Sequence, residues 1–412
     1  MPIIRIFVSM TGSSSMPVPQ QERILSIDLL RGVAVLGILI MNIQHFSMPQ
    51  AAYINPTAYG DLNGLNKWIW ILSQMLARGK FMGVFSMLFG AGVLLFAQRS
   101  ELKGWNSAAL HYRRMGWLFL FGMMHAYLLW SGDILVSYAL CGMLVFLMRH
   151  KRPLTLIWIS FAFFIFPILL NIYFVWSIPY WPEETMQFTL ESWKPGMEEL
   201  QHYLDVYRGS WLKQMELRVS GSIFMQTGYF FMGTFWRTMA LMLLGMALYK
   251  WEVFSCGRSR GFYRLMVISG LVIGYMLTGL GIYLNFKNQW SMEFSMFLGK
   301  EFNYVGSVGV ALGYTGMVML FSKTTAKAGI KQMFSAVGRM AFTNYILMTV
   351  LCTFIFYGHG LGLYGSVERK FQILIVLAIW ILIILISHIW LKRFRFGPLE
   401  RIWRALTYWS RS

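Results

Sequence analysis

The chain has 412 residues, of which 57% are hydrophobic and 13% are charged, and its mean hydropathy is +0.53. Soluble domains carry about a quarter charged residues, so this composition excludes an ordinary soluble protein and indicates a polytopic membrane protein. The formal net charge is +19. Because Lys and Arg lie in short clusters between apolar runs, that charge reflects membrane topology and argues against nucleic-acid binding.

The first 22 residues precede the long apolar runs. Their apolar stretch, IIRIFVSM, is too short and too poorly flanked for a signal peptide. We expect residues 1–22 to form a disordered extension, with Met16 as an alternative start, and residues 23–408 to form a single transmembrane domain.

Apolar runs recur along the rest of the chain, and they predict an all-α bundle of ten spanning helices. The expected spans are 29–47, 79–97, 115–131, 134–149, 154–178, 228–249, 265–286, 303–322, 335–356 and 371–391. The segment 66–77 is expected either to lie in the membrane interface or to extend the second span outward.

Basic residues are concentrated in every second loop, which predicts that both termini are cytoplasmic. The longest loop, 179–227, is then extracytoplasmic, and part of it is amphipathic. We expect it either to cap the outer membrane surface or to form a lid over an acceptor site. We also expect a multi-pass membrane protein in contact with membrane lipids.

The first predicted span carries polar groups where hydrocarbon is expected. Asn42 follows Arg31 by eleven residues, a rise of about 16 Å that reaches the midplane of a ~30 Å core. His45 lies on the same face. Polar groups at this depth face protein or water and often carry function. The alternatives are an interhelical hydrogen bond for Asn42 and a wetted interfacial position for His45.

The third predicted span repeats this spacing, because His125 follows Arg114 by eleven residues. His125 and Asn42 therefore share one depth, and His125 is either a packing residue or a proton-transfer group. Asp133 lies in the following turn, WSGDIL, and is expected to cap the next helix. Direct contact between Asp133 and His125 would require the helix to unwind.

The motif GRMAFTNY places Arg339 and Asn344 at the inner end of the ninth predicted span. Helix packing, anionic lipids and a phosphate-bearing cytoplasmic ligand all explain such residues. No HExxH, Walker or CxxC pattern occurs, and Cys141, Cys256 and Cys352 form no disulfide framework, so no metal site is expected.

Six motifs carry a family resemblance. They are SIDLLRGVAVLGILIMNI, AAYINP, KFMGVFSMLFGAG, HAYLLWSGDIL, GRMAFTNY and RFRFGPLERIWRALTY. They run in order from about residue 23 to 408, and on them the chain resembles the YeiB family of bacterial integral-membrane proteins. That family looks like a branch of a wider set of transmembrane acyltransferases, which includes the lysosomal heparan glucosaminide acetyltransferase and the bacterial sugar O-acyltransferases.

The resemblance also suggests which residues react. In the sugar O-acyltransferases a first-helix arginine is followed eleven residues later by a histidine; Arg31 matches the arginine, but Asn42 stands where the histidine would be. The heparan enzyme has an asparagine there and a catalytic histidine shortly after it, and here His45 follows at a shorter spacing. The position of His125 recurs in the YeiB family whereas that of His45 varies, so the resemblance favours His125 as the base.

The resemblance implies an acyltransferase that uses cytoplasmic acyl-coenzyme A, with acetyl-coenzyme A the expected donor. His125 would be the base or accept the acyl group, Asn42 would bind the thioester or its oxyanion, and a homodimer is expected. The donor-side residues would be Arg31, Arg114, Arg339, Asn344, Arg393 and Arg395, and the acceptor-side residues Asp133 and Arg237. The alternative is a transporter of a small metabolite or lipid, although the sequence shows no inverted repeat.

Overall fold

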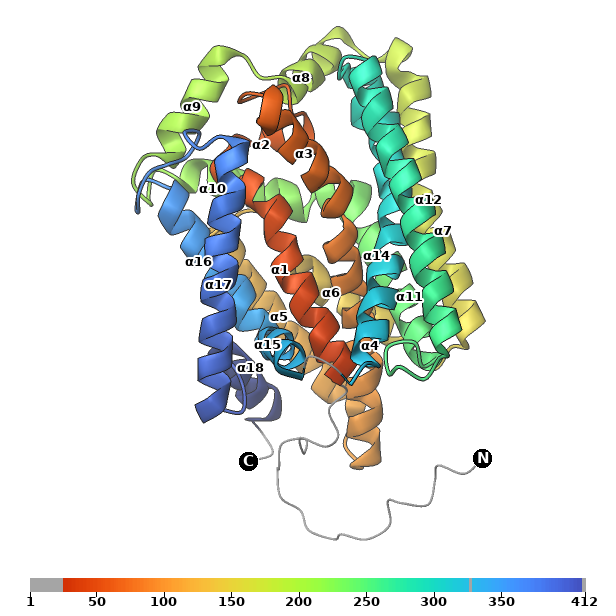
Figure 1. Cartoon of the computed structure of the whole chain (residues 1–412). Helices are drawn as coiled ribbons and strands as arrows, with labels where there is room; N and C mark the ends of the chain where they lie inside the picture. The colour runs from red at the N-terminus through yellow and green to blue at the C-terminus, as the bar shows by residue number, and fades with distance from the viewer. Residues whose placement is uncertain (1–24, 326–327, 410–412) are drawn as a thin grey trace.

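The computed structural model describes residues 25–325 and 328–409, and Figure 1 shows their arrangement. The predicted extension 1–22 lies outside the described residues. Within them every regular element is a helix, which confirms the all-α prediction. The first helices are α1 (Leu25–Ser47), α2 (Gln50–Ile54), α3 (Gly64–Leu76), α4 (Lys80–Leu102), α5 (Ser107–Leu128), α6 (Leu135–Phe146) and α7 (Pro153–Ser177).

After α7 the chain forms several short helices and then mostly long ones. The short ones are η2 (Ile178–Tyr180), α8 (Glu183–Trp193), α9 (Met197–Tyr207), α10 (Met215–Gln226) and η3 (Phe230–Thr234). The others are α11 (Phe235–Lys250), α12 (Arg260–Lys287), α13 (Met292–Phe294), η4 (Ser295–Gly299), α14 (Lys300–Ser322), α15 (Ala328–Arg339), α16 (Ala341–Phe356), α17 (Arg369–Arg393) and α18 (Pro398–Tyr408).

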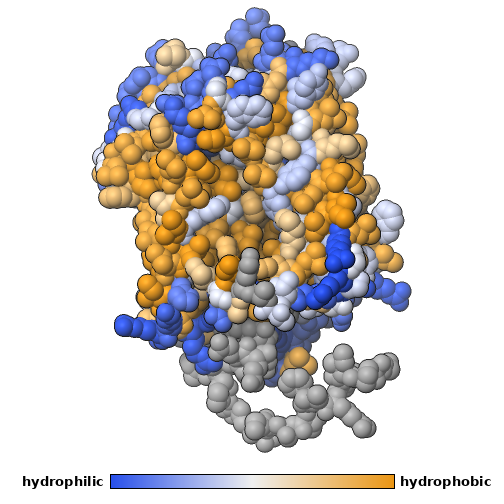
Figure 2. Space-filling view, viewed as in Figure 1, coloured by the Kyte–Doolittle hydropathy of each residue, from blue (hydrophilic) through white to orange (hydrophobic). Residues whose placement is uncertain are grey.

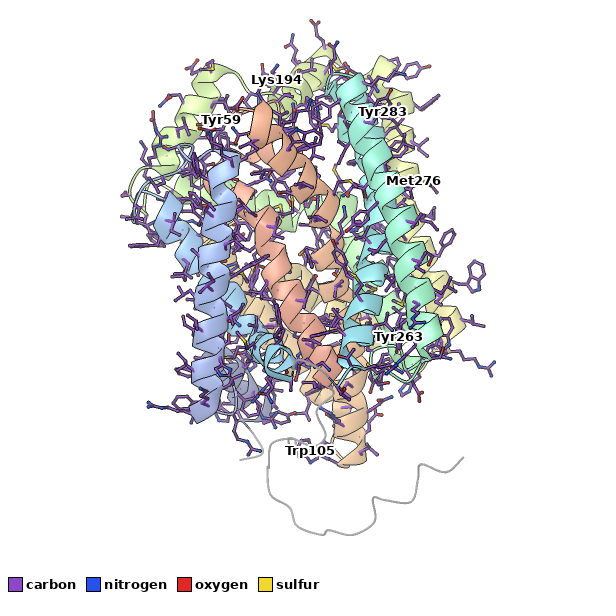
Figure 3. The ribbon with its side chains drawn as sticks, viewed as in Figure 1. Tyr59, Trp105, Lys194, Tyr263, Met276 and Tyr283 are labelled. Carbon is purple, nitrogen blue, oxygen red and sulfur yellow. The ribbon has the colours of Figure 1, made fainter. Side chains whose placement is uncertain are left out.

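The surface matches a protein that crosses a membrane. Figure 2 shows a broad hydrophobic band around the middle, with hydrophilic side chains at both ends. The apolar windows of α7, α12 and α17 are only 17%, 17% and 22% buried, so these helices face outward. Figure 3 shows Met276 of α12 within this band, Lys194 and Tyr59 at one end, and Trp105 at the other. Apolar side chains exposed in this pattern are expected to contact lipid.

Seven helical segments of the described chain are long and apolar enough to span a membrane, or eight if the bent pair α15 and α16 counts as one span. The predicted spans 115–131 and 134–149 correspond to α5 and to the shorter apolar helix α6, and neither is among the seven. The count of ten therefore stays a prediction. The start of α1 and helix α18 lie at the same end of the molecule (Figure 1), as an even number of crossings requires.

Close helix packing positions α1 at the centre of the bundle. A Cβ atom at Gly32 would collide with the carbonyl of Phe334, and one at Gly338 with the carbonyl of Asp28. The missing side chains let α1 and α15 approach to backbone contact, which is typical of membrane helix pairs.

Two helices are interrupted within the bundle. α3 and α4 form one candidate span, Gly64–Leu102, with a break at Ala77–Gly79 where Gly79 has a φ of 76°. This arrangement favours the alternative in which segment 66–77 extends the second span. α15 and α16 meet at an angle of 78°. Glu400 of α18 accepts hydrogen bonds there from the backbone N–H groups of Phe342 and Thr343 at the start of α16.

The predicted loop 179–227 folds into helices at the end of the molecule opposite α18 (Figure 1). It is fastened to the bundle at the end of α5, where the carbonyl oxygen of Leu128 accepts hydrogen bonds from Trp211 Nε1 at 2.9 Å and Arg218 Nη1 at 2.8 Å. A further bond joins the N–H of Gly358 to the carbonyl of Tyr207. The segment thus covers the ends of α5 and α16.

Candidate functional site

Three buried polar side chains form a hydrogen-bonded relay between α5 and α16. His125 Nδ1 lies 2.7 Å from Asp133 Oδ1, and His125 Nε2 lies 2.9 Å from Thr349 Oγ1. Their residues are 2% exposed for His125, 7% for Asp133 and 1% for Thr349. Buried polar groups are normally paired in this way, and here the pairing runs in one line through the imidazole.

The end of α5 makes this relay possible. The helix stops at Leu128, and the N–H groups of Leu129 and Trp130 both donate to the carbonyl of His125. The chain then turns back, so that Asp133 reaches His125 and its Oδ2 also accepts the N–H of Val136 at 2.9 Å. Asp133 therefore caps α6, as the sequence predicts, and also contacts His125. The sequence analysis made direct contact conditional on the helix unwinding, and α5 does end at Leu128, before Asp133.

The chemistry of the partners fixes the protons of the relay. A carboxylate only accepts hydrogen bonds, so Nδ1 carries the proton that points to Asp133. In the neutral imidazole Nε2 then carries the lone pair, which faces Thr349 Oγ1 at 2.9 Å. This is the arrangement in which an imidazole acts as a general base, held in one tautomer and one orientation by a carboxylate.

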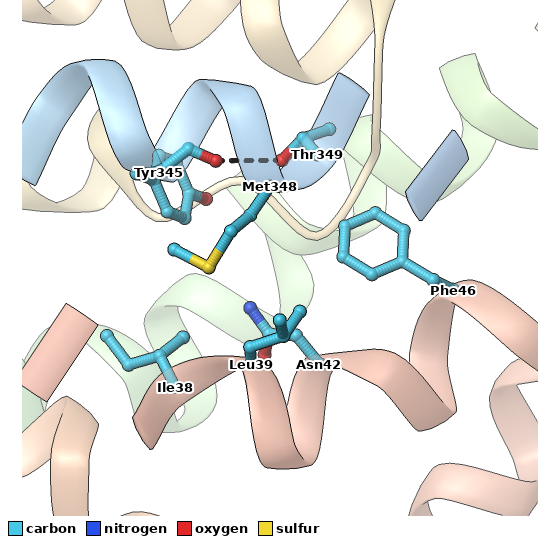
Figure 4. Close-up of a pocket in the computed structure, with 7 residues that line it drawn as sticks. All are labelled: Ile38, Leu39, Asn42, Phe46, Tyr345, Met348 and Thr349. Carbon is cyan, nitrogen blue, oxygen red and sulfur yellow. Dashed lines mark hydrogen bonds between the residues drawn. The ribbon is translucent and has the colours of Figure 1, made fainter. Parts of the chain in front are cut away.

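Asn42 faces the same region from α1. It lines a small cavity together with Thr349, and Figure 4 shows α1 and α16 on its two sides. The remaining lining residues are Ile38, Leu39, Phe46, Tyr345 and Met348. The cavity volume is about 10 Å³, which is room for about one water molecule. The side chain of Asn42 has no hydrogen-bond partner among the described residues, so the interhelical bond of the packing interpretation is absent.

His45 occupies a separate position on α1. Its Nδ1 accepts a hydrogen bond from Trp130 Nε1 at 2.8 Å, and its ring packs edge-on against Tyr53 at 5.8 Å. Trp130 lies between the two histidines, since its ring is also 6.2 Å from that of His125. His45 thus lies beside the relay and takes no part in its hydrogen bonds.

Three arginines, Arg31, Arg114 and Arg404, lie near one another at the end of the molecule that the charge pattern predicts to be cytoplasmic. The guanidinium of Arg114 lies 4.9 Å from the ring centre of Phe96 and 4.4 Å from that of Trp403. It also lies within electrostatic range of Arg31 and Arg404. Arg31 forms an ion pair with Asp28 at 3.0 Å. Like charges held together in this way favour an anionic ligand or anionic lipid.

The other predicted donor-side residues divide into two groups. Arg339 Nη2 donates to the carbonyl of Arg395 at 3.1 Å, and Arg393 and Arg395 are exposed. Asn344 is fully buried and donates to the carbonyl of Val337 and to Ser387 Oγ. The amide of Asn344 therefore joins helices, as the packing interpretation holds, and does not point toward the arginines.

Arg237 lies on α11 and contacts α14, where it donates to the carbonyl of Tyr304 at 3.0 Å and to Ser307 Oγ at 2.7 Å. Its guanidinium packs over the ring of Tyr304 at 4.5 Å. The structure therefore puts the two predicted acceptor-side residues in different contacts, with Asp133 in the relay and Arg237 beside the interrupted α3–α4 span.

The sequence reasoning missed Thr349. It stands in the apolar run ILMTVLCTF, where a lone threonine commonly bonds its own helix backbone. Thr349 Oγ1 also lies 3.4 Å from the carbonyl oxygen of Tyr345, and its one hydroxyl proton serves either that carbonyl or His125 Nε2. Thr349 differs from the nearby Thr353 only in its packing against α5, so the sequence around Thr349 could not have identified it as a partner of His125.

Comparisons with known proteins place the chain in a family. Residues 248–410 match the family model described as "Protein of unknown function (DUF418)". The "Uncharacterized protein YxaH" of Bacillus subtilis (strain 168) is 33% identical over 97% of both chains. The "Uncharacterized protein YeiB" of Escherichia coli (strain K12) is 29% identical over 94% of this chain and 96% of its own. No solved structure matches the chain. The matches run through nearly its whole length, and the chain belongs to the YeiB family of bacterial membrane proteins.

Proposed function

We propose that this protein is a membrane-embedded acyltransferase of the bacterial inner membrane. It would move an acyl group, in the first instance acetyl, from cytoplasmic acyl-coenzyme A to a hydroxyl or amine. The observation that carries the proposal is the relay Asp133–His125–Thr349 next to the unpaired amide of Asn42. A base and an amide donor, about half a membrane thickness from the basic ends of their helices, suit a reaction on a thioester carbonyl.

The donor would enter from the end of the molecule that carries Arg31 and Arg114. Guanidinium groups bind phosphates through charge-assisted hydrogen bonds. The indole of Trp403, which lies against Arg114, offers a flat surface for an adenine ring. The pantetheine arm would then extend between the helices toward Asn42.

The proposed reaction uses the lone pair on Nε2 of neutral His125. The acceptor hydroxyl or amine gives its proton to Nε2 as its oxygen or nitrogen attacks the thioester carbonyl carbon. Asn42 Nδ2 donates to the carbonyl oxygen, which becomes an oxyanion. The C–S bond then breaks, and the coenzyme A thiolate takes the proton from Nε2. The Asp133 carboxylate stabilises the imidazolium between these two steps.

Substrate binding must open the site in this scheme. The cavity at Asn42 holds about one water molecule, which leaves no room for a pantetheine arm. Thr349 occupies Nε2 in the ligand-free state, so the acceptor has to displace its hydroxyl or approach beside it. α1 and α16 would therefore separate locally, and Thr349 would act as a positioning residue that holds the ring until substrate arrives.

The test measures acetyl-coenzyme A hydrolysis and transfer by the purified protein in detergent. Wild type is compared with His125→Ala and Asn42→Ala, and the matched controls are His202→Ala and Asn288→Ala, which change exposed residues. We expect activity in the wild type and the controls and its loss in the two site variants. Full activity in both site variants would remove His125 and Asn42 from the mechanism.

Donor binding has its own test, because it does not require the acceptor. Coenzyme A and acetyl-coenzyme A at millimolar concentration should raise the thermal midpoint of the wild type. Arg114→Gln should reduce this shift, whereas Arg264→Gln, which removes an exposed arginine of α12, should retain it. No shift with either ligand would count against the acyltransferase.

A transporter is the second candidate, and the interrupted helices favour it. α3–α4 is broken at Ala77–Gly79, and α15–α16 bends by 78°; broken helices line the substrate sites of many transporters. Substrate uptake by reconstituted vesicles, together with the absence of any coenzyme A effect, would support transport over acyl transfer.

A further inference from the structure

Three cationic side chains meet at the break between α3 and α4. Lys80, which is 0% exposed, lies within electrostatic range of Arg78 and Arg237. A Cβ atom at Gly79 would lie 3.4 Å from Arg237 Nη2, so this guanidinium lies directly against the break. We name Arg78, Lys80 and Arg237 the break cluster.

The hydrogen-bond partners of the break cluster are all uncharged. Lys80 Nζ donates to the carbonyl of Gln74 at 2.7 Å and to Asn303 Oδ1 at 2.6 Å. Arg78 Nη1 donates to Gln74 Oε1 at 3.0 Å, and Arg237 bonds a carbonyl and a hydroxyl of α14. No ion pair within 4.0 Å joins the cluster to a described carboxylate.

One acidic residue lies within electrostatic range of the cluster and does not balance it. Glu301 interacts with both Arg237 and Lys300, and one of its oxygens accepts a hydrogen bond from Asn171 at 3.0 Å. Lys300, which is exposed, adds a further positive charge, so the four cations exceed the single carboxylate. Of the break cluster, Lys80 is fully buried and Arg78 and Arg237 are partly buried, and an anion beside them would offset the loss of hydration.

Unused hydrogen-bond donors lie beside these charges. Gln74 is 3% exposed, its Oε1 is bound to Arg78, and its Nε2 has no partner among the described residues. α4 also begins at the break with no side-chain cap, so the positive end of its helix dipole lies beside the cluster. Of its first N–H groups, those of Lys80 and Gly83 bond the carbonyls of Ala77 and Gly79.

A row of contacting side chains connects the break cluster to the relay. The guanidinium of Arg78 lies 5.7 Å from the ring centre of Tyr53, which packs against His45 at 5.8 Å. His45 bonds Trp130, and the ring of Trp130 lies 6.2 Å from that of His125. The break cluster and the relay are therefore connected by one continuous set of packed side chains.

We propose that the break cluster binds a phosphate group, and that this phosphate belongs to the acceptor of acyl transfer. Lys80 already donates to Gln74, Asn303 and Thr278 and contributes its charge, whereas Arg78 and the unpaired Gln74 Nε2 can still donate. A phosphate, with three acceptor oxygens and up to two negative charges, matches this group better than a single carboxylate. The ligand is a phosphate ester, either a phospholipid headgroup or a soluble molecule. Its role as acceptor rests on the proposed function, whereas the phosphate site does not.

The test measures thermal stabilisation of the full-length protein in detergent and chloride buffer. The lipid probe is dioctanoyl phosphatidylglycerol, with dioctanoylglycerol as its phosphate-free control; the soluble probe is glycerol 3-phosphate. We expect one phosphate probe to stabilise the wild type while dioctanoylglycerol does not. Stabilisation by the lipid alone identifies a phospholipid, and stabilisation by glycerol 3-phosphate identifies a soluble ester.

Variants then locate the site. Arg78→Gln and Arg237→Gln should each weaken the effective probe about 10- to 100-fold, whereas Arg264→Gln should leave its affinity unchanged. If Arg237→Gln does not fold, Arg78→Gln alone tests the site. This variant is expected to fold, because the partly exposed guanidinium of Arg78 makes a single hydrogen bond to the described residues. Equal affinity in Arg78→Gln and the wild type, or no stabilisation of the wild type by either phosphate probe, would overturn the proposal.

These results are independent of the coenzyme A titration. Binding of the phosphate probe through Arg78 without binding of coenzyme A would support the phosphate site and contradict the acyltransferase assignment. Binding of coenzyme A without binding of either phosphate probe would support the acyltransferase assignment and contradict the phosphate site.

Discussion

Replacement of Asp133 distinguishes two roles of its carboxylate, orienting His125 for proton transfer and capping α6. Its two carboxylate oxygens serve different partners, His125 at 2.7 Å and the N–H of Val136 at 2.9 Å. Asp133→Asn can keep the cap if the amide oxygen faces Val136. The amide nitrogen then faces His125 Nδ1, which favours the tautomer with its proton on Nε2. That tautomer cannot accept a proton from Thr349 or from an acceptor.

The two roles predict different magnitudes. Asp133→Asn loses one charge-assisted hydrogen bond and should lower the free energy of unfolding by about 1.5–3 kcal/mol. Asp133→Ala leaves the N–H of Val136 and the Nδ1–H of His125 buried without partners, at about 1–3 kcal/mol each. Turnover should fall by up to about 10⁴-fold in Asp133→Asn, as expected for an imidazole in the wrong tautomer.

The assays are thermal unfolding in detergent, followed by tryptophan fluorescence, and coenzyme A release from acetyl-coenzyme A measured by chromatography. Asp205→Asn is the matched control, since Asp205 is exposed on α9, and it should change stability by less than about 0.5 kcal/mol. Wild-type turnover in Asp133→Asn would refute the relay, even if Asp133→Ala confirmed the cap.

Thr349→Val should lower turnover about tenfold through the lost hydrogen bond to His125 and leave KM for acetyl-coenzyme A unchanged. Thr349→Ser should restore turnover. A stable acyl ester on Thr349 would contradict its positioning role. Asn42→Ala should lower turnover about 10²- to 10³-fold with no loss of thermal stability, because its amide has no partner; a large drop in stability would show a packing role instead. Asn344→Ala should lower the free energy of unfolding by about 1–3 kcal/mol and leave coenzyme A affinity unchanged, as measured by the two thermal assays above. Burial raises the pKa of the Glu400 carboxyl above its usual value, so the folded state binds this proton more tightly than the unfolded state. The stability gained from the protonated carboxyl is lost as pH rises through the folded pKa. Glu400→Gln should remove that part of the pH dependence of the thermal midpoint.

The heights of Asn42 and His125 along their helices could be predicted from the sequence, because an α-helix rises by about 1.5 Å per residue. Two helices that start at inner arginines and run in the same direction place residues of equal offset at equal height. The rise per residue does not give the rotation of each helix about its axis, so it does not predict which neighbours the two side chains face. In the structure both residues lie next to Thr349, His125 through a contact of 2.9 Å and Asn42 as a fellow lining residue of the small cavity.

The end of α5 could not be predicted from local sequence. The run HAYLLW contains neither proline nor glycine before Gly132, so the helix is expected to continue. Trp211 and Arg218 of the distant outer segment satisfy the carbonyl of Leu128 instead. A tertiary contact thus replaces the next helical turn, and this allows Asp133 to reach His125.

The number of spans also depends on tertiary context. α6 has only 12 residues, and α16 is joined to α15 through a bend of 78°. Hydropathy alone treats such short and bent segments as ordinary crossings. Their lengths are tolerated because neighbouring helices and the Glu400 cap satisfy the backbone groups that a break exposes.

The most direct test of the account is a density map of the protein with a non-hydrolysable acetyl-coenzyme A analogue. The account predicts its phosphates against Arg31 and Arg114, and its carbonyl carbon within about 4 Å of both His125 Nε2 and Asn42 Nδ2, near-attack geometry being about 3–3.5 Å. An analogue bound with its acyl end away from His125, or on the outer face of the protein, would contradict it.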